Sequence, residues 1–179
     1  MKQLLKNINP FQLGIVVDDL DSAVKNHSDI FNIKRWYRPV FTSVTHLYKG
    51  IERDLELDIA IGFSGGSQIE LIEVKRGEDN AYVEFFMANQ LIHTGVTVRQ
   101  FDTKVNDMHE MGFELIFSGT LKTARANTVR VAFFDTRAAL GYVIELIEST
   151  ALGINVGMPE WAFRAGIPTG DITLYQPKT

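Results

Sequence analysis

The chain of 179 residues contains no cysteine, and this absence removes several kinds of chemistry. A disulfide framework, a thiolate nucleophile and a thiolate metal site all require cysteine. Apolar runs are short, and none approaches the roughly 18 residues that a membrane-spanning helix needs. The first ten residues also have no apolar core long enough for a signal peptide. We therefore expect a cytoplasmic protein that does not act in a membrane.

Excess positive charge is also missing. The chain has 18 lysines and arginines against 22 acidic residues, a net charge of -4 and a pI near 5.6. Nucleic-acid binding needs clustered basic residues, so we do not expect a nucleic-acid partner. Hydrophobic residues make up 45% of the chain and charged residues 22%, a globular composition. The length suits one ordinary domain, or two small ones that share a core.

What the chain does contain is a repeat. The pentapeptide I-E-L-I-E occurs at residues 69–73 and again at residues 144–148. Each copy closes a stretch that opens with a second shared pattern, F-Q-L-G-I-V-V-D-D-L-D-S-A-V at residues 11–24 and I-H-T-G-V-T-V-R-Q-F-D-T-K-V at residues 92–105. The sequence therefore predicts two copies of one supersecondary unit, laid end to end.

Each unit is predicted to follow the order β-α-β-β-β, which makes an α+β protein. Alternating, β-branched and aromatic residues predict the strands, and capping signals predict one helix in each unit, the second ended by Gly112. The expected strands are 11–17, 36–48 with an interruption near Pro39, 55–61 and 68–74, then 92–98, 113–118, 129–134 and 142–148. The expected helices are 21–31, 79–89 and 102–111. The predicted divisions are a first module at 1–78, a connecting helix with the second module at 79–150, and a C-terminal extension at 151–179. We expect this extension to pack on the surface or on a partner subunit, with Trp161 and Phe163 as anchors.

Four polar side chains fall at equivalent positions of the two units. Gln12 matches His93 near the start of each unit, and Glu70 matches Glu145 near the end. Side chains on a strand alternate between its faces. The aliphatic residues beside each of the four therefore claim the face under the helix, and all four candidates are predicted to project from the opposite face.

If the two sheets curl around one cavity, these four side chains converge in it. Two carboxylates facing one cavity repel each other unless a cation lies between them. Three oxygen donors and one imidazole suit Zn, Ni, Co or Mn, and the sequence does not choose among these divalent metals. Each residue alone has an ordinary structural explanation, so the prediction depends on the symmetric set. Glu73 and Glu148 share the repeat but fall on the opposite face, and we expect them to be structural.

These motifs resemble the vicinal oxygen chelate superfamily, which includes glyoxalase I, methylmalonyl-CoA epimerase, extradiol dioxygenases and bleomycin-resistance proteins. The resemblance covers about residues 10–150. It depends on G-I-V-V-D-D-L-D-S-A-V, Q-I-E-L-I-E, E-F-F-M-A-N-Q-L-I-H-T-G-V and F-F-D-T-R-A-A-L-G-Y-V-I-E-L-I-E. The last three are most similar to methylmalonyl-CoA epimerases and their relatives. The resemblance implies paired βαβββ modules in a curved mixed sheet that lines a cavity.

The resemblance also implies a metal set made of Gln12, Glu70, His93 and Glu145. Epimerase-like members usually begin this set with histidine, whereas a Gln, Glu, His, Glu set is similar to that of some glyoxalase I enzymes. Those enzymes bind glutathione through an arginine soon after the first ligand, where this chain continues L-G-I-V-V. Extradiol dioxygenases need two histidines, and this chain supplies one, so neither glutathione nor extradiol chemistry is expected.

The resemblance leads to a metal-dependent lyase or isomerase that forms an enolate from a small carbonyl substrate, such as a CoA thioester. The cation would act as a Lewis acid, and Glu145 or a second carboxylate would move the proton. Glu70 belongs to the same catalytic set. Glu56 and Asp58 are further candidates, because the aliphatic residues of that strand are expected to claim the helical face. The alternative, two charges on a solvent-facing strand, remains open.

Weaker candidates and two other functions complete the sequence-based predictions. His46 can reach the pocket or be a core histidine, and His27 and His109 are expected on exposed helix faces. Arg125, Arg130 or Arg137 can hold an anionic substrate. For Arg137, shaping its own loop is the simpler explanation. A non-catalytic binding protein of the bleomycin-resistance type would use an aromatic pocket; core packing accounts for the same residues, which are Trp36, Tyr37, Phe41 and Tyr48. An interaction module that docks through its tail is a third function. We also expect a homodimer.

Overall fold

The computed structural model describes residues 10–77, 79–125 and 127–178. The first half of the chain contains β1 (Gln12–Val16), α1 (Leu20–Phe31), β2 (Trp36–Pro39), β3 (Ser43–Tyr48), β4 (Ile51–Glu52), β5 (Glu56–Ser64) and β6 (Ser67–Arg76). The second half contains the π-helix η1 (Tyr82–Met87), β7 (Ile92–Thr97), α2 (Phe101–Glu110), β8 (Glu114–Lys122), β9 (Asn127–Asp135), α3 (Arg137–Leu140) and β10 (Val143–Ala151). The extension adds β11 (Ile154–Asn155), α4 (Glu160–Gly166) and β12 (Ile172–Tyr175). Within the described ranges, no helix is both long and apolar enough to cross a membrane.

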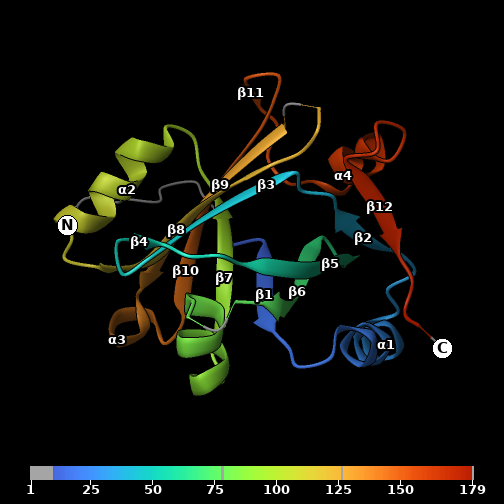
Figure 1. Cartoon of the computed structure of the whole chain (residues 1–179), viewed down its shortest axis with the longest axis horizontal. Helices are drawn as coiled ribbons and strands as arrows, with labels where there is room; N and C mark the ends of the chain where they lie inside the picture. The colour runs from blue at the N-terminus through green and yellow to red at the C-terminus, as the bar shows by residue number, and fades with distance from the viewer. Residues whose placement is uncertain (1–9, 78, 126, 179) are drawn as a thin grey trace.

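The strands form one curled, mixed sheet in the order β12-β2-β5-β6-β1-β7-β10-β9-β8-β3-β4, and β11 pairs with β10. The first βαβββ module supplies β2, β5, β6 and β1, and the second supplies β7, β10, β9 and β8. The modules meet at the antiparallel pair of β1 and β7, which lies at the centre of Figure 1. The predicted α+β fold of two tandem modules is confirmed. The exact module boundaries stay a prediction, and residues 1–9, 78, 126 and 179 of those ranges lie outside the described residues.

One helix from each module covers the outer face of the sheet. Leu20 and Val24 of α1 pack with Leu71 of β6, and α2 packs in the same way against β9 and β10. In Figure 1 the two helices flank the central strands on opposite sides. Helix α1 begins one residue before the predicted start, because the side chain of Asp19 accepts a hydrogen bond from the Ser22 N–H and caps the helix. The inner face of the sheet is therefore free to line a cavity.

The strand predicted at residues 36–48, with its interruption near Pro39, divides at that point into β2 and β3. Pro39 has no N–H to continue the ladder, and the Val40 and Thr42 N–H groups bond instead to Asp171 and Lys122 carbonyls. β2 pairs with β5 of its own module, whereas β3 pairs with β8 of the other. Three residues thus connect nearly opposite ends of the sheet order. The sheet must curl until those ends approach each other.

The C-terminal extension packs on its own chain. β12 continues the sheet beside β2, and Phe163 of α4 is buried against Tyr37 and Phe63. Phe163 is therefore an anchor as expected, but the Trp161 side chain is 61% exposed and is not. Figure 1 places α4 and β12 next to β2.

Candidate metal centre

The four predicted ligands lie in two rows across the four central strands. In the first row Gly14 of β1 pairs with both Glu70 of β6 and His93 of β7. In the second row Gly95 of β7 pairs with both Gln12 of β1 and Glu145 of β10. The two rows are related by the same symmetry as the sequence repeat, so each module contributes two ligands and one glycine.

The two glycines make room for the ligands. A Cβ at Gly14 would lie 1.8 Å from His93 Nε2, and a Cβ at Gly95 would lie 2.1 Å from Gln12 Oε1. Real Cβ atoms do not approach other atoms this closely, so any side chain at either position would displace a ligand. The matching glycines of the repeat therefore serve the site, each clearing space for the ligand of the other module.

The ligand atoms of three residues are close together. His93 Nε2 lies 3.3 Å from Glu70 Oε2 and 3.3 Å from Glu145 Oε2. One ligand atom from each of the three residues lies within 4.8 Å of the others, and all three residues are buried. The His93 ring is fully buried and packs edge-to-face against both Phe86 and Phe133. The cluster is rigid, buried and negatively charged around one imidazole.

The electrostatics of the cluster reflect this crowding. Burial alone lowers the pKa of the His93 imidazole, but the Glu145 and Glu70 carboxylates overcome that effect and raise it to about 9. Burial raises the pKa of the Glu145 carboxyl to about 7, with His93 opposing the shift. Without a cation, a proton on His93 is thus the counter-charge of the carboxylates. A divalent metal ion would replace that proton.

Gln12 is oriented by a neighbour that the sequence did not indicate. Its Nε2 donates a 2.7 Å hydrogen bond to Gln68 Oε1, and Gln68 in turn donates to the Met158 carbonyl. The amide is thereby fixed with its oxygen free, and this oxygen has no partner among the described residues. Because Gln68 holds the amide nitrogen of Gln12, the amide oxygen points away from this contact and is available as a metal ligand.

A divalent cation fits this donor set. Glu145 Oε2 lies 3.3 Å from His93 Nε2, and like Gln12 Oε1 it is buried without a hydrogen bond of acceptable geometry in the described part of the chain. Buried polar atoms without partners are costly, and coordination to a metal ion would satisfy both. The ligand types are three oxygens and one nitrogen, which are the donors of Zn, Ni, Co or Mn sites.

Gln12, Glu70 and Glu145 lie at the floor of a cavity of about 510 Å³, whereas the fully buried His93 does not line it. Tyr82 lines the cavity beside them. Burial raises the pKa of the Tyr82 hydroxyl well above its usual range, and the two carboxylates add to the shift. Tyr82 is therefore a neutral hydroxyl in the cavity. Sequence reasoning missed it because it lies on the connecting helix, outside both repeats.

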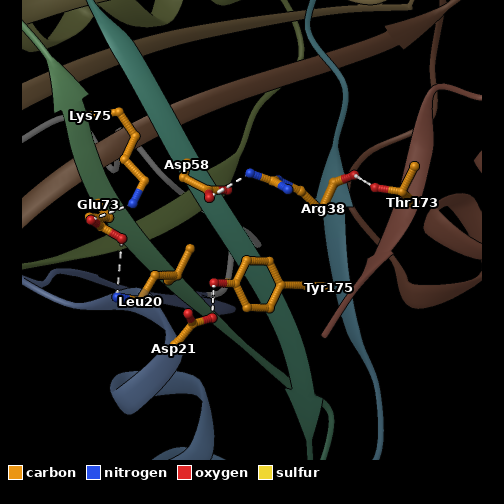
Figure 2. Close-up of polar contacts among 8 residues, drawn as sticks. All are labelled: Leu20, Asp21, Arg38, Asp58, Glu73, Lys75, Thr173 and Tyr175. Carbon is orange, nitrogen blue, oxygen red and sulfur yellow. Dashed lines mark hydrogen bonds and ion pairs between the residues drawn. The ribbon is translucent and has the colours of Figure 1, made fainter. Parts of the chain in front are cut away.

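The predicted orientation of Glu56 and Asp58 is wrong. Asp58 faces the helix side of the sheet, where its carboxylate pairs with Arg38 at 2.5 Å, as Figure 2 shows. Glu56 is exposed and lies 3.4 Å from Arg76. The cavity side of β5 is instead formed by Ile59 and Ile61. Both acids are therefore remote from the cavity floor and cannot exchange a proton with a ligand there.

Glu73 and Glu148 lie on the outer face, as expected. Glu73 accepts a hydrogen bond from the Leu20 N–H at the start of α1 and forms an ion pair with Lys75. Figure 2 shows both contacts. Glu148 lies 3.5 Å from Arg130. The second glutamate of each pentapeptide thus fastens the outer face of its module, whereas the first faces the cavity.

The weaker candidates divide between the cavity and the framework. Arg125 lines the cavity. Arg130 pairs with Asp102 on the outer face, and Arg137 forms a two-point ion pair with Asp135 that shapes its loop. His46 is buried among aromatic rings and lies 3.4 Å from the Ala81 N–H. Half-buried His27 bonds to its own helix, and His109 is exposed.

The proposed aromatic pocket contains only part of its cluster. Phe41 lines the cavity. Trp36 lies beneath α1, where its Nε1 donates to Ser28, and the Tyr37 and Tyr48 hydroxyls donate to Glu160 and Glu84. Core packing therefore accounts for most of this cluster.

Comparison with known proteins identifies the class of this chain. Residues 11–133 match the sequence profile of the Glyoxalase/Bleomycin resistance protein/Dioxygenase superfamily, and the chain belongs to that superfamily. No curated protein matches the chain in sequence.

Solved structures share the fold at low sequence identity. A hypothetical protein from Bacillus halodurans has a TM-score of 0.54 at 20% identity, over 83% of this chain and 99% of its own. Methylmalonyl-CoA epimerase from Mycobacterium tuberculosis has a TM-score of 0.51 at 17% identity, over 90% and 95%. A Streptomyces coelicolor methylmalonyl-CoA epimerase variant, in complex with 2-nitronate-propionyl-CoA, has a TM-score of 0.52 at 17% identity, over 83% and 97%. At these identities the likeness concerns the fold.

Proposed function

We propose that this protein is a metal-dependent isomerase or lyase that acts on a small carbonyl compound through an enolate. The observation that carries the proposal is the buried cluster of Glu70, His93 and Glu145, whose ligand atoms lie within 4.8 Å of one another. With Gln12, these residues would hold a divalent cation. Bound there, the cation would supply positive charge that polarises the substrate carbonyl and lowers the pKa of the adjacent C–H.

The residues of the cavity floor would position the substrate and move its proton. Burial raises the pKa of the Glu145 carboxyl to about 7 in the metal-free protein, and its carboxylate, at the floor, would be the group that takes and returns the proton. The neutral Tyr82 hydroxyl lies in the same cavity and can donate a hydrogen bond to a substrate oxygen. Apolar walls around both groups keep water from competing with the substrate.

Membership of the superfamily supports this proposal, since its members include enzymes that act on carbonyl compounds. Another methylmalonyl-CoA epimerase with this fold was solved with methylmalonyl-CoA and an ammonium ion, at a TM-score of 0.53 and 16% identity. That neighbour favours an isomerase, but the low identity leaves the substrate of this chain open.

Metal content measured by plasma mass spectrometry tests the proposal. We expect near-stoichiometric divalent metal in the native protein and its loss in the Glu70→Ala/Glu145→Ala double variant. The Glu73→Ala/Glu148→Ala double variant is a matched control, because it removes the other glutamate of each pentapeptide from the outer face. If the native protein takes up none of Zn, Ni, Co or Mn, or if the control loses metal equally, the proposal is wrong.

A non-catalytic binding protein is the second candidate, and the apolar walls of the cavity favour it. A protein that only sequesters a hydrophobic compound has no need of two buried glutamates. The two functions are distinguished by proton exchange: the enzyme would exchange the proton beside the carbonyl of its substrate with deuterated water, observed by NMR, and a sequestering protein would not. The homodimer and the cytoplasmic location stay predictions, and light scattering tests the former.

A further inference from the structure

The cavity is covered by residues 156–171, which we call the roof. The roof contains α4 and its flanking loops, and it lies beyond residue 133, where the superfamily match ends. Trp161, Ala162 and Ala165 of α4 line the cavity. A segment added after the matched region therefore forms part of the wall around any ligand.

The roof is fastened to both modules. On the first, Phe163 packs against Tyr37, whose hydroxyl donates a 2.9 Å hydrogen bond to Glu160. On the second, the buried Asp171 carboxylate accepts hydrogen bonds from the Arg125 N–H and from Asn127 Nδ2, at 3.3 and 2.7 Å. Contacts at both ends make the roof a fixed wall, which can select ligands by shape.

Between the floor and the roof the cavity is apolar. Its walls are aliphatic and aromatic side chains from both modules: Phe41, Ile59, Ile61, Leu121, Val129, Val131 and Ile147. A body inserted between them gains by removing apolar surface from water, and flat rings pack well against the aromatic side chains of the roof. The volume of about 510 Å³ is in the range of sites for compact small molecules.

Charge argues against a long phosphorylated ligand. Arg125 is the only cation among the described residues that line the cavity, and the Asp171 carboxylate is bonded beside it. A CoA thioester carries several phosphate charges, which proteins recognise with arginines and lysines. The cavity provides one such group and two glutamates at its floor.

We propose that the roof determines specificity, and that the substrate is a carbonyl compound with a compact apolar body such as a phenyl ring, not a CoA thioester. The inference of a carbonyl group in the substrate depends on the function proposed above. The inference of an apolar body depends only on the residues of the roof and the walls. The two parts can therefore fail separately.

Calorimetric titration of the metal-loaded protein with three probes tests the proposal. Phenylpyruvate has the head and the apolar body, pyruvate has the head alone, and phenylacetyl-CoA has the body on a thioester. We expect phenylpyruvate to bind at least tenfold more tightly than either of the others. Ala162→Phe, which fills the space under the roof, should reduce that preference at least tenfold, whereas Ala139→Phe on the exposed helix α3 should leave it unchanged.

Tryptophan fluorescence locates the bound probe. The chain has two tryptophans; Trp161 lines the cavity, whereas Trp36 is buried under α1. Phenylpyruvate should change the emission of the native protein and leave that of Trp161→Phe unchanged. Because Trp161 is exposed, Trp161→Ala should fold even if Ala162→Phe does not, and it should weaken phenylpyruvate several-fold with pyruvate unaffected.

Equal affinity for phenylpyruvate and pyruvate, equal or tighter binding of phenylacetyl-CoA, or no binding of phenylpyruvate at millimolar concentration would overturn the roof proposal. Metal content distinguishes the two proposals. A protein that holds no metal but still prefers phenylpyruvate to pyruvate retains the roof proposal and loses the proposed function. A protein that holds metal without this preference retains the function and loses the roof proposal.

Discussion

Replacing Gly14 by alanine tests the arrangement of the metal centre most directly. The new Cβ would lie 1.8 Å from His93 Nε2, whereas ordinary contact begins at 3.4 Å, so the ring must move by about 1.6 Å. Metal–ligand distances tolerate only about 0.2 Å. Because Phe86 and Phe133 hold the buried ring, it cannot move aside and keep its coordination.

We therefore expect Gly14→Ala to lose at least about 100-fold in metal affinity, or about 2.7 kcal/mol, since even outer-shell partners of a metal ligand contribute 10–100-fold. Overpacking should also destabilise the fold by about 1–3 kcal/mol. Titration of the metal-free protein with Co(II), followed by absorption, measures the affinity, and urea denaturation measures the stability.

Gly62→Ala is the matched control. It also lies in a strand, and its Cβ would meet Trp36 and Ile33 at 2.9 Å on the helix side of the sheet. It should lower stability and leave metal affinity intact. A folded Gly14→Ala variant with native affinity would refute the reasoning, and so would an equal loss of affinity in Gly62→Ala.

Three further variants test separate parts of the structure. Gln68→Leu removes the acceptor that orients Gln12 and should lower Co(II) affinity about tenfold; unchanged affinity would mean that Gln12 is not a ligand. Asp58→Asn breaks the ion pair with Arg38 and should lower the free energy of unfolding, measured with urea, by about 1 kcal/mol. The metal content should stay native, and a loss of metal would mean that Asp58 does contribute to the site. Burial lowers the pKa of His46 from 6.5 to about 4, so its neutral ring contributes stability above pH 6.5 that is lost as pH falls toward 4, because the unfolded chain takes the proton first. Between pH 7.5 and 5 the native protein should lose about 2 kcal/mol more than His46→Leu, and parallel losses in the two proteins would contradict the shift.

The repeat correctly predicted that the four candidate ligands come together, because it indicated both the position and the face of each. On β6 and β10 the aliphatic residues beside Glu70 and Glu145 pack under helices, so alternation placed the glutamates on the cavity side. The same alternation failed on β5. Its phase was correct, but both faces of that strand are packed, and Ile59 and Ile61 line the apolar cavity wall. A period of two cannot say which of two buried faces carries the helix.

Long-range pairing explains the other differences. The residues from Trp36 to Tyr48 have strand-forming composition throughout, and only the partners β5 and β8 divide them between two modules. Similarly, β12 is a strand because the edge of β2 is available. Its four residues carry too short a pattern to predict it. Local sequence specified the elements, and the curled sheet determined where they pair.

The symmetry of the candidate metal centre is broken where Gln12 matches His93, and again at the residues beside them. By the repeat, Gln68 of β6 corresponds to Val143 of β10, and the pairing places Gln68 beside Gln12 and Val143 beside His93. Gln12 therefore has an outer-shell partner, whereas His93 Nδ1 has none in the described part of the chain. An amide needs such a partner to choose between its oxygen and its nitrogen. The His93 imidazole is already oriented by its packing against two phenyl rings. A hydrogen bond thus orients Gln12 in the first module, and ring packing orients His93 at the equivalent position of the second module.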